Sequence, residues 1–478
     1  MITPLRHVLA LVLVLQLTAV AAADLTLPAL FGDGMVLQRN RAVAVWGTAD
    51  ADQQITVTFG DQKHTTTADA SNRWRVMLDA MPASAEGRTL TITGDGATIE
   101  HEDVLVGEVW IGSGQSNMEW PMHRSDAEAE IAAAGDPHLR LFTVKRAVAH
   151  EPRTDVEGSW QETSPQSVRN FSAVGYFFAL KLREELDVPV GMVISAWGGT
   201  PAEAWAPRDR LEAEPRLAPL LTRWDRQVEN NANAANHNHR PANLYNAMIA
   251  PLTPMTFRGA IWYQGESNVG RAHQYRTIFP LMIESWRERF AQGDFPFYYA
   301  QIAPFNYNSN PAFAAELWEA QLLTMRMLPN TGMAVLTDIG DVSDIHPTNK
   351  VDVGDRLAAW ALAKTYNLDV PYSGPVYTHQ AIEDGAIRLH FDHAQGMKSA
   401  DGEPLSHFTI AGADGEFHAA TAEVDGATVV VRSGSVPHPI AVRFAWHDSA
   451  EPNFVNASGL PASPFRTDSF PLLTRDSH

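Results

Sequence analysis

The chain has 478 residues, of which 45% are hydrophobic and 19% are charged, a composition typical of a globular protein with a large core. Its formal net charge of −20 argues against nucleic acid or an anionic membrane surface as a partner. With no cysteine, it has no thiol nucleophile, cysteine metal site or disulfide. At about 100–200 residues per domain, the length predicts two to four domains.

Residues 1–23 have the pattern of an export signal. Arg6 and His7 precede an apolar run, Val8–Val20, and the three alanines that follow offer a cleavage site. The run is shorter than the roughly 20 residues that a membrane-spanning helix needs, although a membrane anchor is the alternative. We therefore expect a signal peptide over residues 1–23, a periplasmic or secreted bacterial protein, and no membrane attachment after cleavage.

Hydrophobic patterning divides the rest of the chain into three regions. From 24 to 102, short alternating segments such as Ile55–Phe59 predict a β-sandwich-like module. From 103 to 370, apolar runs alternate with helical-period stretches such as Tyr275–Phe290, which predicts an α/β domain with a mostly parallel sheet and helices on both sides. From 371 to 478, strand signals return and predict a β-rich C-terminal module with an extended closing segment.

Four unusual loops follow apolar runs in the α/β region. Ligand sites in parallel sheets form beyond the carboxyl ends of the strands, so we expect these loops to meet. Together they supply a hydroxyl, backbone amides, a side-chain amide and a carboxylate–imidazole pair, which are the groups that acyl transfer requires. The loops are Gly112–Met118, Trp197–Thr200, Gln264–Asn268 and Asp338–Pro347.

Ser116 is the candidate nucleophile, because it follows a strand within a glycine-containing turn. The alternative is a serine that caps the next helix, which would use the same hydroxyl oxygen. The chemistry of the neighbouring loops favours a nucleophilic role for Ser116 over a capping role.

His346 is the candidate general base. Pro347 favours extended backbone at the residue before it, and residues two apart in an extended segment face the same way. Asp344 can therefore lie beside the imidazole and hold its tautomer, as the acid of a catalytic triad does. Glu266 is a second candidate for this acid, and Asp341 is a weaker third.

The remaining loop residues are candidates for binding the oxyanion and the substrate. Gln264 could donate its side-chain N–H to a developing oxyanion, together with the backbone amides of Ser116 and of Gly198 or Gly199. For substrate contacts we expect Asn117, Trp197 and Asn268. The tryptophan face suits stacking on a sugar ring, with core packing as the alternative.

A metal site fits the sequence less well. His237 and His239 have ligand-like spacing but lie in a polar Asn/Ala-rich loop, where solvated histidines are more common than ligands. Asp338 and its neighbouring aspartates could bind a divalent cation, but no second histidine cluster follows another strand. We expect no metal and no cofactor.

Several of these motifs resemble the sialate O-acetylesterase family of the SGNH-hydrolase superfamily, and they occur in the same order along most of the chain. They are Gly114-Gln115-Ser116-Asn117-Met118, Trp262-Tyr263-Gln264-Gly265-Glu266-Ser267-Asn268, Asp344-Ile345-His346-Pro347 and the tail from Gly459 to Asp468.

The resemblance implies a flavodoxin-like, three-layer SGNH catalytic domain with accessory β-rich modules at both ends. It also implies metal-free serine esterase chemistry on carbohydrate O-acetyl groups, with Ser116 as nucleophile, His346 as base and Gln264 in place of the superfamily's usual oxyanion asparagine. The superfamily often spaces its acid and histidine as Asp-x-x-His, so the shorter Asp344-x-His346 leaves the orienting acid open between Asp344 and Glu266.

The sequence therefore predicts a secreted carbohydrate O-acetylesterase that forms an acetyl-enzyme intermediate and acts on acetylated sialic acid or acetylated plant glycans. Two alternatives stay open, a non-catalytic glycan-binding protein and a metal-dependent hydrolase that uses the aspartate cluster.

Overall fold

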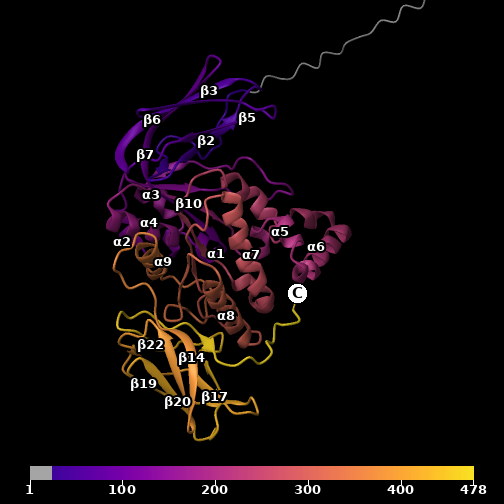
Figure 1. Cartoon of the computed structure of the whole chain (residues 1–478), viewed down its shortest axis with the longest axis vertical. Helices are drawn as coiled ribbons and strands as arrows, with labels where there is room; N and C mark the ends of the chain where they lie inside the picture. The colour runs from indigo at the N-terminus through magenta and orange to yellow at the C-terminus, as the bar shows by residue number, and fades with distance from the viewer. Residues whose placement is uncertain (1–23, 478) are drawn as a thin grey trace, which may run out of the picture.

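The computed structural model describes residues 24–477, so the predicted signal peptide lies outside the described residues. Three regions follow one another along the long axis of the molecule: a β-rich module, an α/β region and a second β-rich module (Figure 1). Within residues 24–477, no helix has the length and apolar character that crossing a membrane requires.

The N-terminal module has two sheets, in which neighbouring strands are antiparallel except that β1 pairs in parallel with β7. One pairs β2 with β5, and the other joins β4, β3, β6 and the first half of β7. In β5, buried Trp74, Val76 and Leu78 alternate with exposed residues, which gives the strand one core-facing side. The strands are β1 (Val36–Gln38), β2 (Val43–Thr48), β3 (Gln54–Phe59), β4 (Gln62–Thr67), β5 (Arg73–Leu78), β6 (Ser84–Gly94) and β7 (Ala97–Gly114).

Strand β7 belongs to both the N-terminal module and the central sheet. Its first half pairs with β6, and its second half pairs with β10 and β11. The module boundary expected after residue 102 therefore falls inside a continuous strand of 18 residues. A shared strand, in place of a flexible linker, ties the module to the sheet that carries Ser116.

The central sheet runs in the order β13-β12-β11-β7-β10-β8-β9, and all neighbouring strands in it are parallel except β8 and β9. When the edge pair β8–β9 is set aside, the remaining five strands follow the 2-1-3-4-5 order of flavodoxin-like sheets. The further strands are β8 (Leu139–Thr143), β9 (Trp160–Glu162), β10 (Val190–Ala196), β11 (Gly259–Tyr263), β12 (Phe297–Ala300) and β13 (Thr331–Ala334).

Helices cover both faces of this sheet, which confirms the predicted α/β organisation. On β12, Tyr298 packs near Trp360 of α9, whereas its neighbours Phe297 and Tyr299 contact Phe279 of α7. Successive strand residues point to opposite faces, so α9 and α7 lie on opposite sides. Helix α4 packs against α9, and α8 packs against α7.

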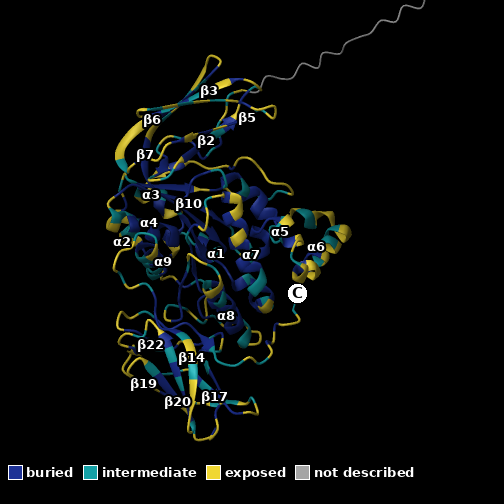
Figure 2. Cartoon of the chain, in the orientation of Figure 1, coloured by how far each residue is buried: buried dark blue, intermediate teal, exposed yellow. Residues whose placement is uncertain are grey.

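The longer helices are α4 (Ala173–Leu186), α6 (Ala218–Asn230), α7 (Ala272–Phe290), α8 (Ala312–Met327) and α9 (Val351–Lys364). The short ones are α1 (Ser116–Glu119), η1 (Met122–Arg124), α2 (Glu128–Ala133), α3 (Pro165–Arg169), η2 (Ala202–Trp205), α5 (Arg208–Glu212), η3 (Pro215–Leu217), η4 (Ala232–Asn236), the π-helical η5 (Tyr245–Ile249), η6 (Ala250–Leu252) and η7 (Glu266–Arg271). Buried residues concentrate in the central sheet and on the helix faces that cover it, whereas α6 is largely exposed (Figure 2).

The C-terminal module has a hydrophobic core of its own between two four-stranded sheets, β14-β15-β20-β19 and β18-β17-β21-β23. Its strands are β14 (Val376–Glu383), β15 (Ala386–Asp392), β16 (Lys398–Ser399), β17 (Phe408–Ala411), β18 (Phe417–Ala419), β19 (Thr421–Asp425), β20 (Thr428–Arg432), β21 (Ala441–Phe444), β22 (Phe454–Val455) and β23 (Phe465–Arg466).

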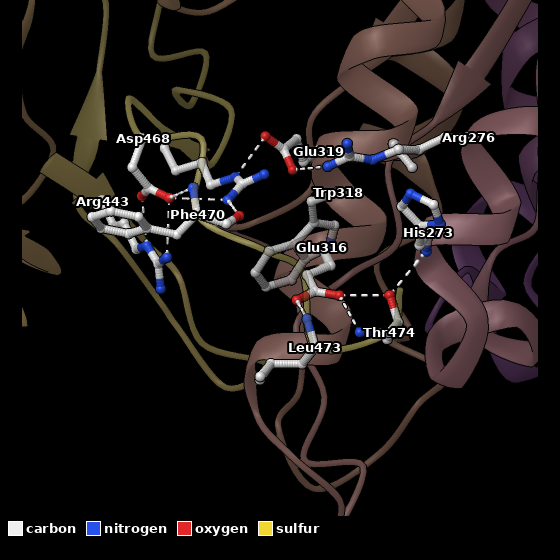
Figure 3. A network of polar contacts seen from close by, with 12 residues as sticks. His273, Arg276, Glu316, Trp318, Glu319, Arg443, Asp468, Phe470, Leu473 and Thr474 are labelled. Carbon is white, nitrogen blue, oxygen red and sulfur yellow. Dashed lines mark hydrogen bonds and ion pairs between the residues drawn. The ribbon is translucent and has the colours of Figure 1, made fainter. Parts of the chain in front are cut away.

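The C-terminal segment returns to the α/β region and is held there by polar contacts (Figure 3). The buried carboxylate of Glu316, on α8, accepts hydrogen bonds from the backbone N–H groups of Leu473 (2.6 Å) and Thr474 (3.0 Å). On the same helix, Glu319 pairs with Arg466 of β23 at 2.9 Å. These contacts fasten the end of the chain to a helix that covers the central sheet.

Candidate active site

Ser116 lies where β7 turns into α1. It is the first residue of the helix, and Gln115 occupies the capping position before it. The Ser116 hydroxyl therefore does not cap the helix. Gly114, two residues before Ser116, has φ +140°. A Cβ at this position would lie 2.1 Å from the carbonyl oxygen of Tyr263, so the turn needs a glycine where β7 meets β11.

The loop after β13 brings His346 to the serine. Its Nε2 lies 2.9 Å from Ser116 Oγ, although the two residues are 230 positions apart in the sequence. On the other side of the ring, His346 Nδ1 lies 3.5 Å from Asp344 Oδ1, which also accepts the backbone N–H of His346 at 2.9 Å. The arrangement has the order of a catalytic triad, with a partly exposed acid.

The surroundings of His346 favour its neutral form. Partial burial lowers the pKa of the imidazole, Asp344 raises it, and the positive charges of Lys350 and Arg124 lower it further. The net pKa is lower than that of an ordinary histidine. A neutral imidazole can accept the proton of Ser116, as a general base must.

Glu266 contacts Asn117, the residue after Ser116. Its Oε1 accepts a hydrogen bond of 2.7 Å from Asn117 Nδ2, and its Oε2 is buried without a hydrogen-bond partner. No hydrogen bond or ion pair joins Glu266 to His346 within residues 24–477, whereas Asp344 contacts the ring. Burial raises the pKa of Glu266 against the opposing effects of its hydrogen bonds and of Lys350. Of the two candidate acids, the geometry favours Asp344.

The Trp197–Thr200 loop follows β10 and lies against the serine. A Cβ at Gly198 would lie 3.2 Å from Cβ of Ser116. The Gly198 N–H donates to Glu119 Oε2 at 2.9 Å, and Glu119 also pairs with Arg146. Gly199 has φ +74°, and its Cβ position is open. The loop therefore brings backbone amides close to Ser116, and the Gly198 amide is bound to the Glu119 carboxylate.

Gln264 and Asn268 point into the protein interior. The Gln264 side-chain N–H₂ donates to the carbonyl of Thr200 (3.2 Å) and to Asn268 Oδ1 (2.7 Å), and both side chains are buried. Asn268 also accepts from Ala202 N and donates to Glu203. Donation from Gln264 to an oxyanion would require the exchange of one existing hydrogen bond, and the amide of Asn268 already binds Gln264, Ala202 and Glu203.

Of the other predicted substrate-binding residues, only Trp197 is accessible. It is partly exposed, and the guanidinium carbon of Arg146 lies 5.7 Å from its ring centroid. Asn117 is 1% exposed and is used within the site, where it donates to Glu266 and to the carbonyl of Ile345 (2.9 Å). Its contacts brace the loops that carry Ser116 and His346.

Sequence reasoning missed Lys350. This side chain is fully buried, and its Nζ donates to Asn117 Oδ1 at 2.6 Å. Burial lowers its pKa to about 7, against the opposing effect of Glu266. A lysine at the start of a helix carries no local sign of burial, because most lysines in such positions are solvated. The contact with Asn117 spans 233 positions and has no sequence signature.

The aspartates near His346 bind different partners and do not form one cluster. Asp338 pairs with Arg356, and Asp341 accepts from Ser343. In the part of the chain that the structure describes, no three acidic, histidine or cysteine side chains gather as a metal-binding set would. His237 and His239 contact each other through their rings, at a centroid distance of 4.6 Å.

Comparison with known proteins identifies the family. A family model described as "Carbohydrate esterase, sialic acid-specific acetylesterase" matches residues 106–363. The sialate O-acetylesterase of Rattus norvegicus is 31% identical over 404 residues, which cover 72% of this chain and 74% of that protein. The human sialate O-acetylesterase is 31% identical over 383 residues, covering 72% of this chain and 71% of that protein.

A solved structure extends the similarity to nearly the whole chain. The crystal structure of a carbohydrate acetylesterase from Xanthomonas citri is 40% identical and superposes with a TM-score of 0.86, covering 94% of this chain and all of that one. These matches confirm the resemblance that the motifs indicated. The chain belongs to the sialic acid-specific acetylesterase family of carbohydrate esterases and is, as a member of it, a carboxylic ester hydrolase that acts on carbohydrates.

Proposed function

We propose that this protein removes O-acetyl groups from carbohydrates through an acetyl-enzyme intermediate on Ser116. The observation that carries the mechanism is the 2.9 Å contact between Ser116 Oγ and His346 Nε2 at the carboxyl edge of the sheet. The family of the chain and the names of its relatives support an acetylated carbohydrate as the substrate.

In the first half-reaction, Ser116 Oγ attacks the acetyl carbonyl carbon while His346 Nε2 takes the hydroxyl proton. The carbonyl becomes a tetrahedral oxyanion. Ser116 begins α1, so its N–H is one of the helix donors without an intrahelical acceptor and can bind this oxyanion. An amide of the Gly198–Gly199 loop adds a second donor. Gln264 is the third, after it exchanges one of its present hydrogen bonds. Collapse breaks the bond to the sugar oxygen, which takes the proton from His346.

In the second half-reaction, His346 takes a proton from water as the water oxygen attacks the acetyl carbonyl carbon. The second tetrahedral intermediate then collapses. Ser116 Oγ leaves with the proton from His346, and acetate is released. Asp344 holds the imidazole in the tautomer with its proton on Nδ1 throughout, and it stabilises the imidazolium in both half-reactions.

The test is hydrolysis of an aryl acetate and release of acetate from acetylated sialic acid and acetylated hemicellulose. We expect S116A to abolish hydrolysis and to remove labelling by a covalent serine probe. Near wild-type turnover of S116A would contradict the mechanism. Activity that a chelator abolishes, and that added metal restores, would favour a metal-dependent hydrolase. The glycan that releases acetate fastest identifies the sugar.

We also propose the finer organisation that the resemblance implies. This is an SGNH-type three-layer domain over residues 103–370 between two β-rich modules, exported by the signal over residues 1–23. The strand order of the central sheet and the helices on both of its faces support the first part. The apolar run that begins at Val8 supports the second. Fractionation of the bacterial host, with N-terminal sequencing of the mature protein, tests the export.

A further inference from the structure

A buried amide bridges two ionisable side chains directly behind the catalytic serine. Asn117 uses all of its polar atoms: Oδ1 accepts from Lys350 Nζ (2.6 Å), and Nδ2 donates to Glu266 Oε1 (2.7 Å) and to the carbonyl of Ile345 (2.9 Å). Lysine can only donate, and the carboxylate and carbonyl can only accept, so the chemistry of its neighbours fixes the orientation of the amide.

This bridge joins the two loops that carry the reacting groups. Asn117 follows Ser116 directly, and Ile345 precedes His346 directly. Each hydrogen bond of the amide therefore restrains the backbone next to a catalytic side chain. Lys350 occupies the capping position directly before α9 and donates to the amide oxygen, so the start of the helix that follows the histidine loop is tied to the helix that carries the nucleophile.

The burial of Lys350 is costly, which argues for a role beyond packing. Its side chain is fully buried and forms no direct ion pair with any carboxylate among residues 24–477. The Nζ atom lies 5.6 Å from the Tyr263 ring centroid and 5.9 Å from that of Trp120. Removing an ammonium group from water carries a large desolvation cost, which one amide and two aromatic faces offset only in part.

We propose that Lys350 is a positioning residue for ester hydrolysis: it locks the Ser116 turn to the His346 loop through Asn117, and its positive charge keeps the neighbouring imidazole in the base form. The inference rests on the proposed function, because it concerns the same serine and histidine. Lys350 acts through Asn117 and through space, and it does not contact the reacting atoms.

The effect of the Lys350 charge on His346 can be tested, because the ionisable groups around Lys350 are known. Glu266 faces it from η7 across the amide, Asp344 and His346 lie on the loop before it, and Tyr263 lies on β11. Burial keeps Tyr263 neutral, since its pKa is raised well above 10. Burial lowers the pKa of His346 and that of Lys350, the latter to about 7, and the charge of Lys350 lowers the pKa of His346 further. Removal of that charge should therefore raise the pKa of His346.

The experiment compares K350M, which removes both the donor and the charge, with K350Q, which keeps a donor but no charge. The readouts are kcat, KM and the acid limb of the pH profile, which is the low-pH range over which kcat/KM for an aryl acetate rises as the base loses its proton. K181M, at a partly exposed lysine, is the control. We expect K350M to lower kcat by about 10- to 100-fold with little change in KM. K350Q should retain more of kcat. Both should move the acid limb to higher pH, because the charge that disfavours the imidazolium is gone.

The double variant K350M/E266Q keeps the inference testable if K350M alone does not fold, because it removes both buried charges at once. We expect it to melt at or above the temperature of the wild type, since neutral replacement of buried charges is often stabilising. It should keep the low kcat and the raised acid limb.

Two results would overturn the inference. One is a folded K350M or double variant with wild-type kcat, and the other is a loss of kcat without any shift of the acid limb. Failure of the proposed function has a different signature, because the wild type and K181M would then show no hydrolysis that depends on Ser116.

Discussion

The indole of Trp120 lies flat against the imidazole of His346, with ring centroids 4.4 Å apart and planes inclined by 13°. Trp120 is itself held by a hydrogen bond of 2.8 Å from its Nε1 to the carbonyl of Arg124. A flat contact of this kind restricts rotation of the histidine ring and keeps Nε2 directed at Ser116.

Replacing Trp120 should therefore impair catalysis more than folding. We expect W120A to lower kcat by about 10- to 100-fold, because a histidine ring free to rotate leaves the geometry in which it can take the serine proton. W120F, which keeps an aromatic face, should retain most of the rate. Steady-state kinetics with an aryl acetate measure both. Equal losses in W120A and W120F would contradict a role for the stacked face.

The pH dependence should report His346. Its pKa is lowered chiefly by burial, so kcat/KM should rise with pH along a limb centred below the ordinary histidine pKa of 6.5. The R124Q substitution removes a positive charge that disfavours the imidazolium, and it should move this limb to higher pH. A pH–rate profile of both enzymes tests the sign. A limb centred above pH 6.5 in the wild type would contradict the assignment of the base.

The acid that supports His346 can be identified from two isosteric variants. We expect D344N to lower kcat by roughly 100-fold, less than the loss for a buried triad acid, because Asp344 is partly exposed and 3.5 Å from Nδ1. Its acid limb should move to lower pH, since the Asp344 charge raises the pKa of His346. E266Q should not move the limb to lower pH, because Glu266 does not contact the imidazole. A limb that moves to lower pH in E266Q and not in D344N would reverse the assignment.

The loop after β10 should not tolerate a larger residue at Gly198. A methyl group there would lie 3.2 Å from Cβ of Ser116 and 3.3 Å from Glu119 Oε2, so G198A must displace either the nucleophile or the carboxylate. We expect kcat to fall by about 10- to 100-fold. G270A is the control, because its Cβ position is open. Wild-type turnover of G198A would show that this loop has room to move.

The C-terminal segment should stabilise the fold through Glu316. E316A would leave the buried N–H and hydroxyl of Thr474 and the partly buried N–H of Leu473 without their acceptor, at a cost of roughly 2–4 kcal/mol in the free energy of unfolding. E284A, at an exposed position on α7, should have little effect. Denaturant unfolding of the two variants gives the comparison. Equal stability would mean that the segment contributes little to the fold.

Much of the α/β region could be predicted from the sequence. Short apolar runs between helical stretches indicated a parallel sheet, and in such a sheet the loops after the strands lie at one edge. This is why Ser116 and His346 could be expected to meet from motifs alone. The N-terminal boundary was less predictable, because β7 continues from one sheet into the next and its apolar pattern does not mark the change of partner.

The partners of the polar side chains depended on the tertiary structure. Gln264 and Asn268 have the composition of ligand-binding residues, yet their amides bind each other and neighbouring backbone in the interior. The sequence left both Asp344 and Glu266 as candidates, and long-range packing put the first beside His346 and the second beside Asn117.

The sequence by itself determined the chemistry of the site: a hydroxyl, an imidazole and a nearby carboxylate on loops that follow strands, in the motif order of a carbohydrate esterase family. Those features are local, since residue type and strand periodicity fix them within a few positions. Only the tertiary structure decided that Lys350 is buried against Asn117, because a contact across 233 positions depends on how the segment before α9 packs beside α1 and leaves no local pattern.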